Sequence, residues 1–179
     1  MAAQAKTLAD AFHETLKDVY FAEKQAVKAL KKSVKAAQAP ELKSAFETHA
    51  TETAGQIERL VQVFAIIGKT PRAKTCKAMQ GLTEEMDEDL EDFGGTEAGD
   101  AVLIGCAQAV EHYEIARYGR LKAWARKLGL ADAEALLDEI LQEEKKTDLL
   151  LSQIAKQGNA KAVKQKAAAP SSRAKSVAV

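Results

Sequence analysis

The sequence has little of what several protein classes require. Its two cysteines, Cys76 and Cys106, are too few for a disulfide scaffold or a cysteine-based zinc finger. Aromatic residues make up only 5% of the chain, so a core would rest mainly on Ala, Leu and Val. No run reaches the roughly 18 apolar residues of a membrane span, and no secretory signal opens the sequence. We therefore expect a cytoplasmic protein with reduced thiols and no membrane contact.

Prolines are also scarce, and this favours helices. The three prolines are Pro40, Pro71 and Pro170, and no extended alternation of polar and apolar residues indicates a strand. A chain of 179 residues suits one domain, or one domain with a tail. The fold class predicted from the sequence is therefore all-α.

Apolar residues recur at helical spacing in four long segments. The predicted helices span about 7–37, 40–67, 99–128 and 132–158, with a shorter acidic helix between 72 and 93. Thr7 and Asp10 resemble a capping box, Pro40 suits a first helical turn, Gly129 follows the third long helix, and Asp132 caps the fourth. Two helical hairpins joined by a long connection predict a four-helix bundle with a crossover.

The net charge of zero conceals an uneven distribution of charge. Residues 156–179 hold six basic and no acidic residues, whereas residues 1–155 carry a net charge of −6. We expect residues 1–156 to form the bundle and 157–179 to form a disordered basic tail, because the tail has few large apolar residues. The tail would act either as a solubilising segment or as a segment that binds nucleic acid or another polyanion weakly and without specificity.

Polar residues interrupt the apolar face of every long helix. Glu23, for example, lies four residues after Val19 and four before Val27, in the middle of a buried stripe. The second helix places His49 and Gln56 on its inner face. The candidate metal ligands found in this way are Glu23, Glu52, Glu114, Glu144, His49, Glu111 and Asp148.

Buried carboxylates need partners, and inner-face Arg and Lys are too few to pair them all. A tilted helix would expose any single glutamate, but four helices repeating the pattern weaken that explanation. Bound metal ions would offset the charge, and carboxylates with an imidazole suit iron, manganese or zinc.

The spacing of the candidates indicates where they meet. Glu23 and Glu52 are 29 residues apart across the first hairpin, and Glu114 and Glu144 are 30 apart across the second. In each hairpin the two glutamates then differ in position along the bundle axis by roughly 5 Å or less. The sequence predicts that all four converge, with His49, Glu111 and Asp148 forming a second polar layer.

Five runs of sequence resemble one family. They are DVYFAEKQ (18–25), ETHATETAGQIERL (47–60), KTCKAMQGLTEE (74–85), AQAVEHYEIARYG (107–119) and EEKKTD (143–148). Over residues 6–156 the chain is similar to the YciE/YciF family of bacterial ferritin-like proteins, formerly a domain of unknown function. The resemblance implies a ferritin-like four-helix bundle, a di-metal centre in which iron is expected first, homodimers, and a link to bacterial stress responses.

The candidate site departs from the usual di-iron pattern, which has Glu-x-x-His on two helices. At that spacing Glu52 is followed by Gly55, and Glu144 by Thr147. Tyr20 and Tyr118 lie near the predicted cluster, either as donors to its carboxylates or as core residues.

Two of the three histidines, His13 and His112, fall off the polar stripe and are interpreted as surface or packing residues.

Three functions are compatible with the sequence. The protein would be a redox metalloprotein that reacts with dioxygen or peroxide, a non-catalytic dimeric stress protein with a structural metal, or a nucleic-acid protector acting through its tail. The acidic body disfavours the third function, because it would repel a polyanion. The same ligands would serve the first two functions.

Overall fold

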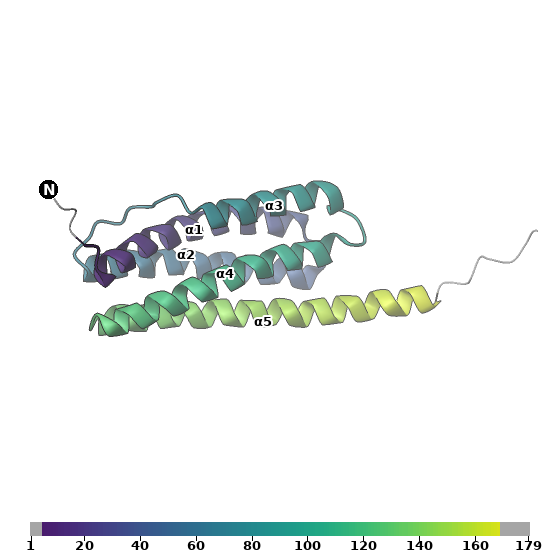
Figure 1. Ribbon diagram of the computed structural model, residues 1–179. Helices are drawn as coiled ribbons and strands as arrows, with labels where there is room; N and C mark the ends of the chain where they lie inside the picture. Colours follow the sequence, from purple (N-terminus) through teal and green to yellow (C-terminus); the bar gives the residue numbers. More distant parts are fainter. Residues whose placement is uncertain (1–4, 169–179) are drawn as a thin grey trace, which may run out of the picture.

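The computed structural model describes residues 5–168, with side chains through residue 158. Within that range the chain is helical and has no strand. The helices are α1 (Leu8–Ala36), α2 (Pro40–Ile66), α3 (Lys77–Phe93), α4 (Gly99–Lys127) and α5 (Ala131–Ala168), as shown in Figure 1. The all-α fold class predicted from the scarcity of proline and the helical periodicity is confirmed.

The helix boundaries follow the local signals in the sequence. Thr7 caps α1 in a capping box, because its hydroxyl accepts from the Asp10 amide at 3.2 Å and Asp10 Oδ2 accepts from the Thr7 amide at 2.8 Å. Pro40 is the first residue of α2. Gly129, with φ of 72°, directly follows the C-cap residue of α4 and allows the sharp turn into α5.

Two details of α5 differ from the sequence-based expectation. Asp132 lies inside the first turn rather than at the cap, where its negative charge favours the helix N-terminus. The helix also continues past Gly158 to Ala168, through a stretch rich in the good helix formers Ala and Lys. The rest of the predicted tail, residues 169–179, lies outside the described residues.

The long helices form two antiparallel hairpins, α1–α2 and α4–α5, whose turns lie at opposite ends of the molecule (Figure 1). The connection between the hairpins runs the length of the molecule and contains α3. Helices α2 and α5 pack together, as do α1 and α4, while α3 lies against α1 and α4. All four long helices therefore face a shared interior.

Apolar clusters fill this interior on both sides of a polar layer. One cluster includes Leu16 of α1 and Leu121 of α4, and the other includes Leu30 of α1 and Leu103 of α4. Glu23 falls between the two leucines of α1 in sequence, and it is fully buried. The polar layer is thus enclosed by apolar packing at both ends.

The carboxylate of Asp100 connects the two hairpins. Its two oxygens accept hydrogen bonds from the backbone amides of Gln38 and Ala39, each at 2.8 Å. Gln38 also donates through its side chain to the backbone oxygen of Thr96 at 2.8 Å. These bonds connect the turn of the first hairpin to the start of α4. They therefore help to fix the position of one hairpin relative to the other along the bundle axis.

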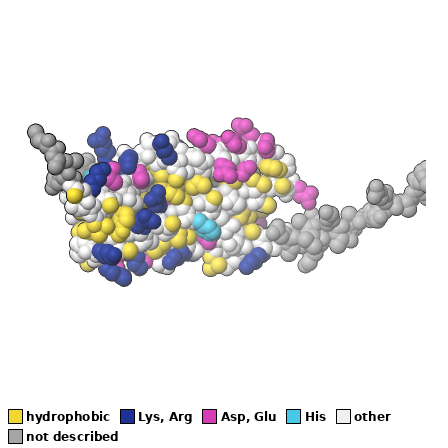
Figure 2. Space-filling model, viewed as in Figure 1, with side chains coloured by type: hydrophobic (Ala, Val, Ile, Leu, Met, Phe, Trp, Pro, Cys, Tyr) yellow, Lys and Arg dark blue, Asp and Glu magenta, His cyan; other side chains and the backbone are white. Residues whose placement is uncertain are grey.

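Charge is unevenly distributed over the surface. Acidic side chains gather over α3 on the face shown in Figure 2, and residues 84–92 alone contain seven acids and no base. In the part of the chain that the structure describes, no helix combines the length and hydrophobicity needed to cross a lipid bilayer.

Candidate metal centre

Two groups of buried side chains have the donor atoms of a metal site, and they share one residue. His49, Glu111 and Glu144 form the first group, and Glu23, Glu114 and Glu144 form the second. In each group the three donor atoms lie within 4.8 Å of one another. Glu144 therefore connects the two groups, as a carboxylate between two adjacent ions would.

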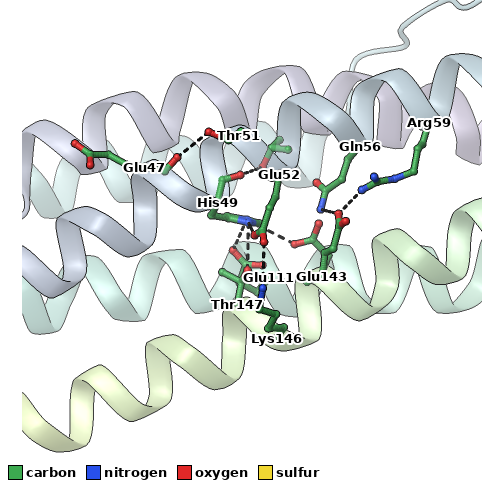
Figure 3. Close-up of polar contacts among 12 residues, drawn as sticks. Glu47, His49, Thr51, Glu52, Gln56, Arg59, Glu111, Glu143, Lys146 and Thr147 are labelled. Atoms are coloured by element: carbon green, nitrogen blue, oxygen red, sulfur yellow. Dashed lines mark hydrogen bonds and ion pairs between the residues drawn. The ribbon is translucent and has the colours of Figure 1, made fainter.

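The imidazole of His49 is the centre of the first group. Its Nε2 lies 3.1 Å from Glu111 Oε1 and 3.6 Å from Glu144 Oε2. Its Nδ1 lies 3.2 Å from the Thr147 hydroxyl. Figure 3 shows the ring pointing from α2 toward Glu111 and Thr147, so Nε2 faces the buried carboxylates, whereas Nδ1 lies beside the Thr147 hydroxyl with Glu52 Oε2 3.7 Å away.

The second group consists of carboxylates alone. Glu23 of α1 and Glu144 of α5 have no solvent exposure, and Glu114 of α4 is only 1% exposed. Tyr118 donates a hydrogen bond to Glu23 Oε1. This bond confirms that Tyr118 is a donor to the cluster, whereas Tyr20 packs its ring edge-to-face on Phe64.

Burial and mutual repulsion make these carboxylates unusually basic. Burial raises the pKa of Glu23 to about 7, although the Tyr118 hydrogen bond and the charge of His49 act in the opposite direction. Burial also raises the pKa values of Glu114 and Glu144 well above the ordinary range, and the charge of Glu23 raises both further. In the absence of a cation, the protein therefore favours protonated forms of these groups.

The pKa of His49 shifts in the direction that favours its charged form. Burial alone would lower it, but hydrogen bonds to Glu111 and Glu52 and the charges of Glu111 and Glu144 outweigh burial and raise this pKa well above its usual value. Before a cation binds, a protonated His49 supplies one of the few positive charges inside the cluster.

The carboxylate oxygens fit a bound cation because many of them lack partners. Among the described residues, the buried carboxylate oxygens without a hydrogen bond are Oε2 of Glu23, Oε2 of Glu111, Oε1 of Glu114 and both oxygens of Glu144. Such groups are rare in folded proteins unless an ion or water satisfies them. The four carboxylates together carry a formal charge of −4, which two divalent cations would neutralise.

Two of the predicted ligands lie outside both groups. Glu52 is 23% exposed and pairs with Lys146 at 3.3 Å, reaching only the Nδ1 side of His49 at 3.7 Å. The prediction that four glutamates converge is therefore wrong for Glu52, because its side chain lies at the edge of the interface between α2 and α5, where it pairs with Lys146 instead of entering either buried group.

Asp148 is the second predicted ligand outside the groups. It is 24% exposed, accepts from Gln108 at 2.8 Å and lies 3.2 Å from His112 Nε2. One turn beyond Glu144, it faces the outer side of α4 instead of His49. His112 is 67% exposed and is thus a surface residue, as predicted.

A polar contact beside the cluster was not predicted. Arg59 forms an ion pair with Glu143, and the fully buried Gln56 donates to the same carboxylate at 3.0 Å (Figure 3). Burial is what raises the pKa of Glu23 in the second group, and the charge of Arg59 acts weakly in the opposite direction. The inner-face position of Gln56 was visible in the sequence, but Arg59, one turn further along, gave no sign of an inward role.

Comparison with known proteins places the chain in a family. The model of the family described as "Domain of unknown function (DUF892)" matches residues 7–168, so the chain belongs to that family. It is 47% identical over 152 residues to Protein YciF of Escherichia coli strain K12, covering 84% of this chain and 91% of that protein. The predicted relationship to the YciE/YciF family is confirmed.

Solved structures agree with this assignment. The structure described as the E. coli stress protein YciF matches with a TM-score of 0.84 and 44% identity, over 88% of this chain and 99% of that chain. A putative structural protein from Rhodopseudomonas palustris, named YcfI, matches with a TM-score of 0.81 and 41% identity, over 85% and 97%.

A more distant structure bears on the fold alone. A two-domain protein from Anabaena variabilis that contains a ferritin-like domain matches with a TM-score of 0.57 and 16% identity, over 98% of this chain and 42% of that chain. The chain thus has a ferritin-like neighbour among known folds.

Proposed function

We propose that this protein is a ferritin-like four-helix bundle that holds a di-metal carboxylate centre, with iron as the first expected metal and manganese or zinc as alternatives. The observation that carries the proposal is the pair of buried donor groups sharing Glu144, whose carboxylate oxygens lack hydrogen-bond partners. Helical bundles with such inward carboxylates are the usual setting for di-iron and di-manganese centres.

Each residue of the cluster has a distinct role in this proposal. Glu144 would bridge the two ions, His49 and Glu111 would bind one of them, and Glu23 and Glu114 would bind the other. Tyr118 would orient Glu23, and Thr147 would hold the second nitrogen of His49, as groups around metal ligands commonly do.

A pair of ferrous ions in such a centre supplies electrons for the reduction of dioxygen or peroxide. The chain itself excludes water, because Glu23, Glu114 and Glu144 are at most 1% exposed. Its apolar clusters keep the carboxylates in place on both sides. Oxidation of iron under stress would fit the description of the E. coli relative as a stress protein.

A structural metal site is the second candidate, because closure is typical of structural sites whereas catalytic sites keep an open position. The buried ligands support this reading, and so does the description of the R. palustris relative as a putative structural protein. We also propose that the protein is a homodimer, as the family resemblance implies, which light scattering would test.

The decisive measurement is metal content together with a spectrum. Protein purified without chelator is analysed for elements, and metal-free protein is titrated with ferrous iron under argon and then exposed to air. We expect two metal ions per chain and a new ultraviolet–visible absorption after air is admitted. Two bound ions with no spectral change would favour the structural role.

A matched pair of double variants distinguishes the loss of metal ligands from a general loss of negative charge. Glu114→Gln with Glu144→Gln removes two buried carboxylates, whereas Glu84→Gln with Glu88→Gln removes two exposed ones on α3. Only the first pair is expected to abolish tight metal binding. Equal metal content in both variants would contradict the proposal.

A further inference from the structure

The buried donor groups have almost no contact with solvent. His49 is 3% exposed and Glu111 is 2% exposed, while Glu23 and Glu144 have no exposure at all. A metal ion therefore reaches them only when two helices separate locally. Such opening is easiest where the side chains between the helices are polar and partly hydrated already.

Two of the interfaces between long helices are poor routes for a cation. The interface between α1 and α4 is covered by α3, whose Met79 and Met86 have exposed fractions of 0% and 3%. Between α4 and α5, Asp148 is 24% exposed, but it is held by Gln108 and His112. A cation would meet thioether groups on the first route, and on the second a carboxylate that is turned away from the cluster.

The interface between α2 and α5 has carboxylates that lead from solvent toward the cluster. The side chain of Glu52 is 23% exposed; one of its oxygens accepts from Lys146 at 3.3 Å, and the other lies 3.7 Å from His49 Nδ1. Glu143, whose side chain is 28% exposed, directly precedes Glu144 in the chain. Figure 3 shows Glu52 and Glu143 in the space between the two helices. Glu52 thus contacts both a surface base and a buried candidate ligand.

A buried oxygen next to Glu143 has no partner. Gln56 has no solvent exposure and donates through Nε2 to Glu143 Oε2 at 3.0 Å, which leaves its Oε1 without a hydrogen bond. The opposite orientation of the amide would place two oxygens against each other. Both carboxylate oxygens of Glu144 are unpartnered as well. Buried oxygens of this kind are suitable ligands for a divalent cation. Oxygen donors therefore continue inward from the partly exposed carboxylate of Glu143.

The basic partners of the two outer carboxylates can be displaced by a cation. The side chain of Lys146 is 72% exposed, so water screens its ion pair with Glu52. Arg59 forms the corresponding ion pair with Glu143. A divalent cation carries twice the charge of either base and is attracted more strongly to the same carboxylate. The two bases thus neutralise the carboxylates only while no metal ion is present.

We propose that the interface between α2 and α5 is the entrance through which divalent cations reach the buried donor groups. Glu52 and Glu143 receive the ion first, in place of Lys146 and Arg59, and Glu144 binds it next. The inference rests on the proposed function, because the chain needs an entrance only if the cluster binds metal. Glu52 and Glu143 therefore determine how fast a metal ion binds, and not how tightly.

Cobalt(II) is the probe for the test, because its bound form absorbs visible light and is stable in air. Metal-free protein is mixed with cobalt(II) by stopped flow to measure the uptake rate, and elemental analysis after dialysis gives the content. Glu52→Gln with Glu143→Gln is expected to slow uptake by about 10-fold or more at unchanged content. The matched control, Asp138→Asn with Asp148→Asn, removes two partly exposed carboxylates of α5 that pair with residues of α4, and keeps the wild-type rate.

A single lysine tests the entrance in the opposite direction. Lys146→Gln removes the base that holds Glu52 and is expected to speed uptake. Lys145→Gln removes the same charge from the neighbouring exposed position and is expected to change the rate less. Because both substitutions alter only exposed side chains, this pair decides the question even if the double carboxylate variant fails to fold.

Uptake rate and metal content separate this inference from the proposed function. Normal content with equal uptake rates in the two double variants would overturn the entrance and leave the metal centre standing, and so would equal rates in Lys146→Gln and Lys145→Gln. A lower content in Glu52→Gln with Glu143→Gln would make these residues ligands, which also overturns the entrance. A wild-type protein that binds no cobalt would overturn both proposals.

Discussion

The phenol of Tyr118 donates a hydrogen bond to the carboxylate of Glu23, joining α4 to α1 inside the polar layer. Both side chains have no solvent exposure. The bond favours the ionised form of Glu23, whereas burial acts more strongly in the opposite direction and raises its pKa to about 7. Tyr118 therefore keeps Glu23 closer to the form that binds a cation.

Tyr118→Phe is expected to weaken metal binding by about 10-fold, within the range found for groups that support metal ligands. Without the hydrogen bond the pKa of Glu23 rises further, so protons compete better with the metal. Isothermal titration calorimetry measures the affinity. Tyr20→Phe is the matched control, because that ring packs on Phe64. Equal affinities in the two variants would show that the Tyr118 hydroxyl has no part in metal binding.

Glu144→Gln is expected to lower metal stoichiometry more than Glu52→Gln. Glu144 belongs to both donor groups, whereas Glu52 is partly exposed and pairs with Lys146. Elemental analysis after dialysis gives the ratio of metal to chain. A larger loss in Glu52→Gln would reverse the assignment of the two residues.

The metal-free protein is expected to lose stability as pH rises from about 4.5 to about 7. The folded state holds the proton of Glu23 up to about pH 7, whereas the unfolded chain releases it near its ordinary pKa, so the folded state binds more protons in this window. Each such proton lowers the free energy of unfolding by about 1.4 kcal/mol per pH unit.

His49 extends the same trend to higher pH. Its folded-state pKa lies well above the ordinary value of 6.5. The stability that protonated His49 contributes is therefore lost as pH rises above 6.5 and through the folded-state pKa. Urea unfolding at several pH values, with and without metal, checks both effects. Because metal displaces these protons, its stabilising effect is expected to grow with pH. A metal-free protein that gains stability between pH 5 and 7 would contradict the assignment.

Asp100→Ala is expected to lower the free energy of unfolding by about 1–3 kcal/mol, because it leaves the amides of Gln38 and Ala39 without their acceptor. Chemical denaturation measures the change. Asp132→Ala, in the first turn of α5, is the control and is expected to cost less. If the two losses were equal, the hairpin connection would add nothing beyond a helix-terminal charge.

The helices and most of the buried polar residues could be predicted from the sequence. The spacing of apolar residues and the residues that begin or end a helix are local properties of the chain. Glu23, Glu111, Glu114 and Glu144 interrupt apolar stripes, and the structure buries all four. Glu52 could not be placed correctly, because matched height along a hairpin does not fix the direction of a side chain around its helix. The buried face of α2 instead includes His49 and Gln56.

Contacts between helices were harder to foresee. The ion pair of Arg59 with Glu143 depends on how α2 and α5 are rotated against each other, which no single helix encodes. The pairing of Asp148 with Gln108 and His112 similarly depends on the crossing of α4 and α5.

His49 can act as a metal ligand, as a support for a ligand or as a packing residue, and what its Nε2 atom binds decides between these roles. That nitrogen lies among carboxylates, 3.1 Å from Glu111 and 3.6 Å from Glu144, while Nδ1 contacts the Thr147 hydroxyl. If Nε2 binds metal, electron spin-echo spectra of the manganese-loaded protein show nitrogen modulation that His49→Gln removes. His112→Gln, changing a histidine that is 67% exposed, leaves the modulation intact.

If His49 only supports a carboxylate ligand, the wild-type spectrum lacks nitrogen modulation and the Gln variant still binds metal about 10–100-fold more weakly. Wild-type affinity in His49→Gln, with the same dependence on pH, would exclude both roles and leave His49 as a packing residue.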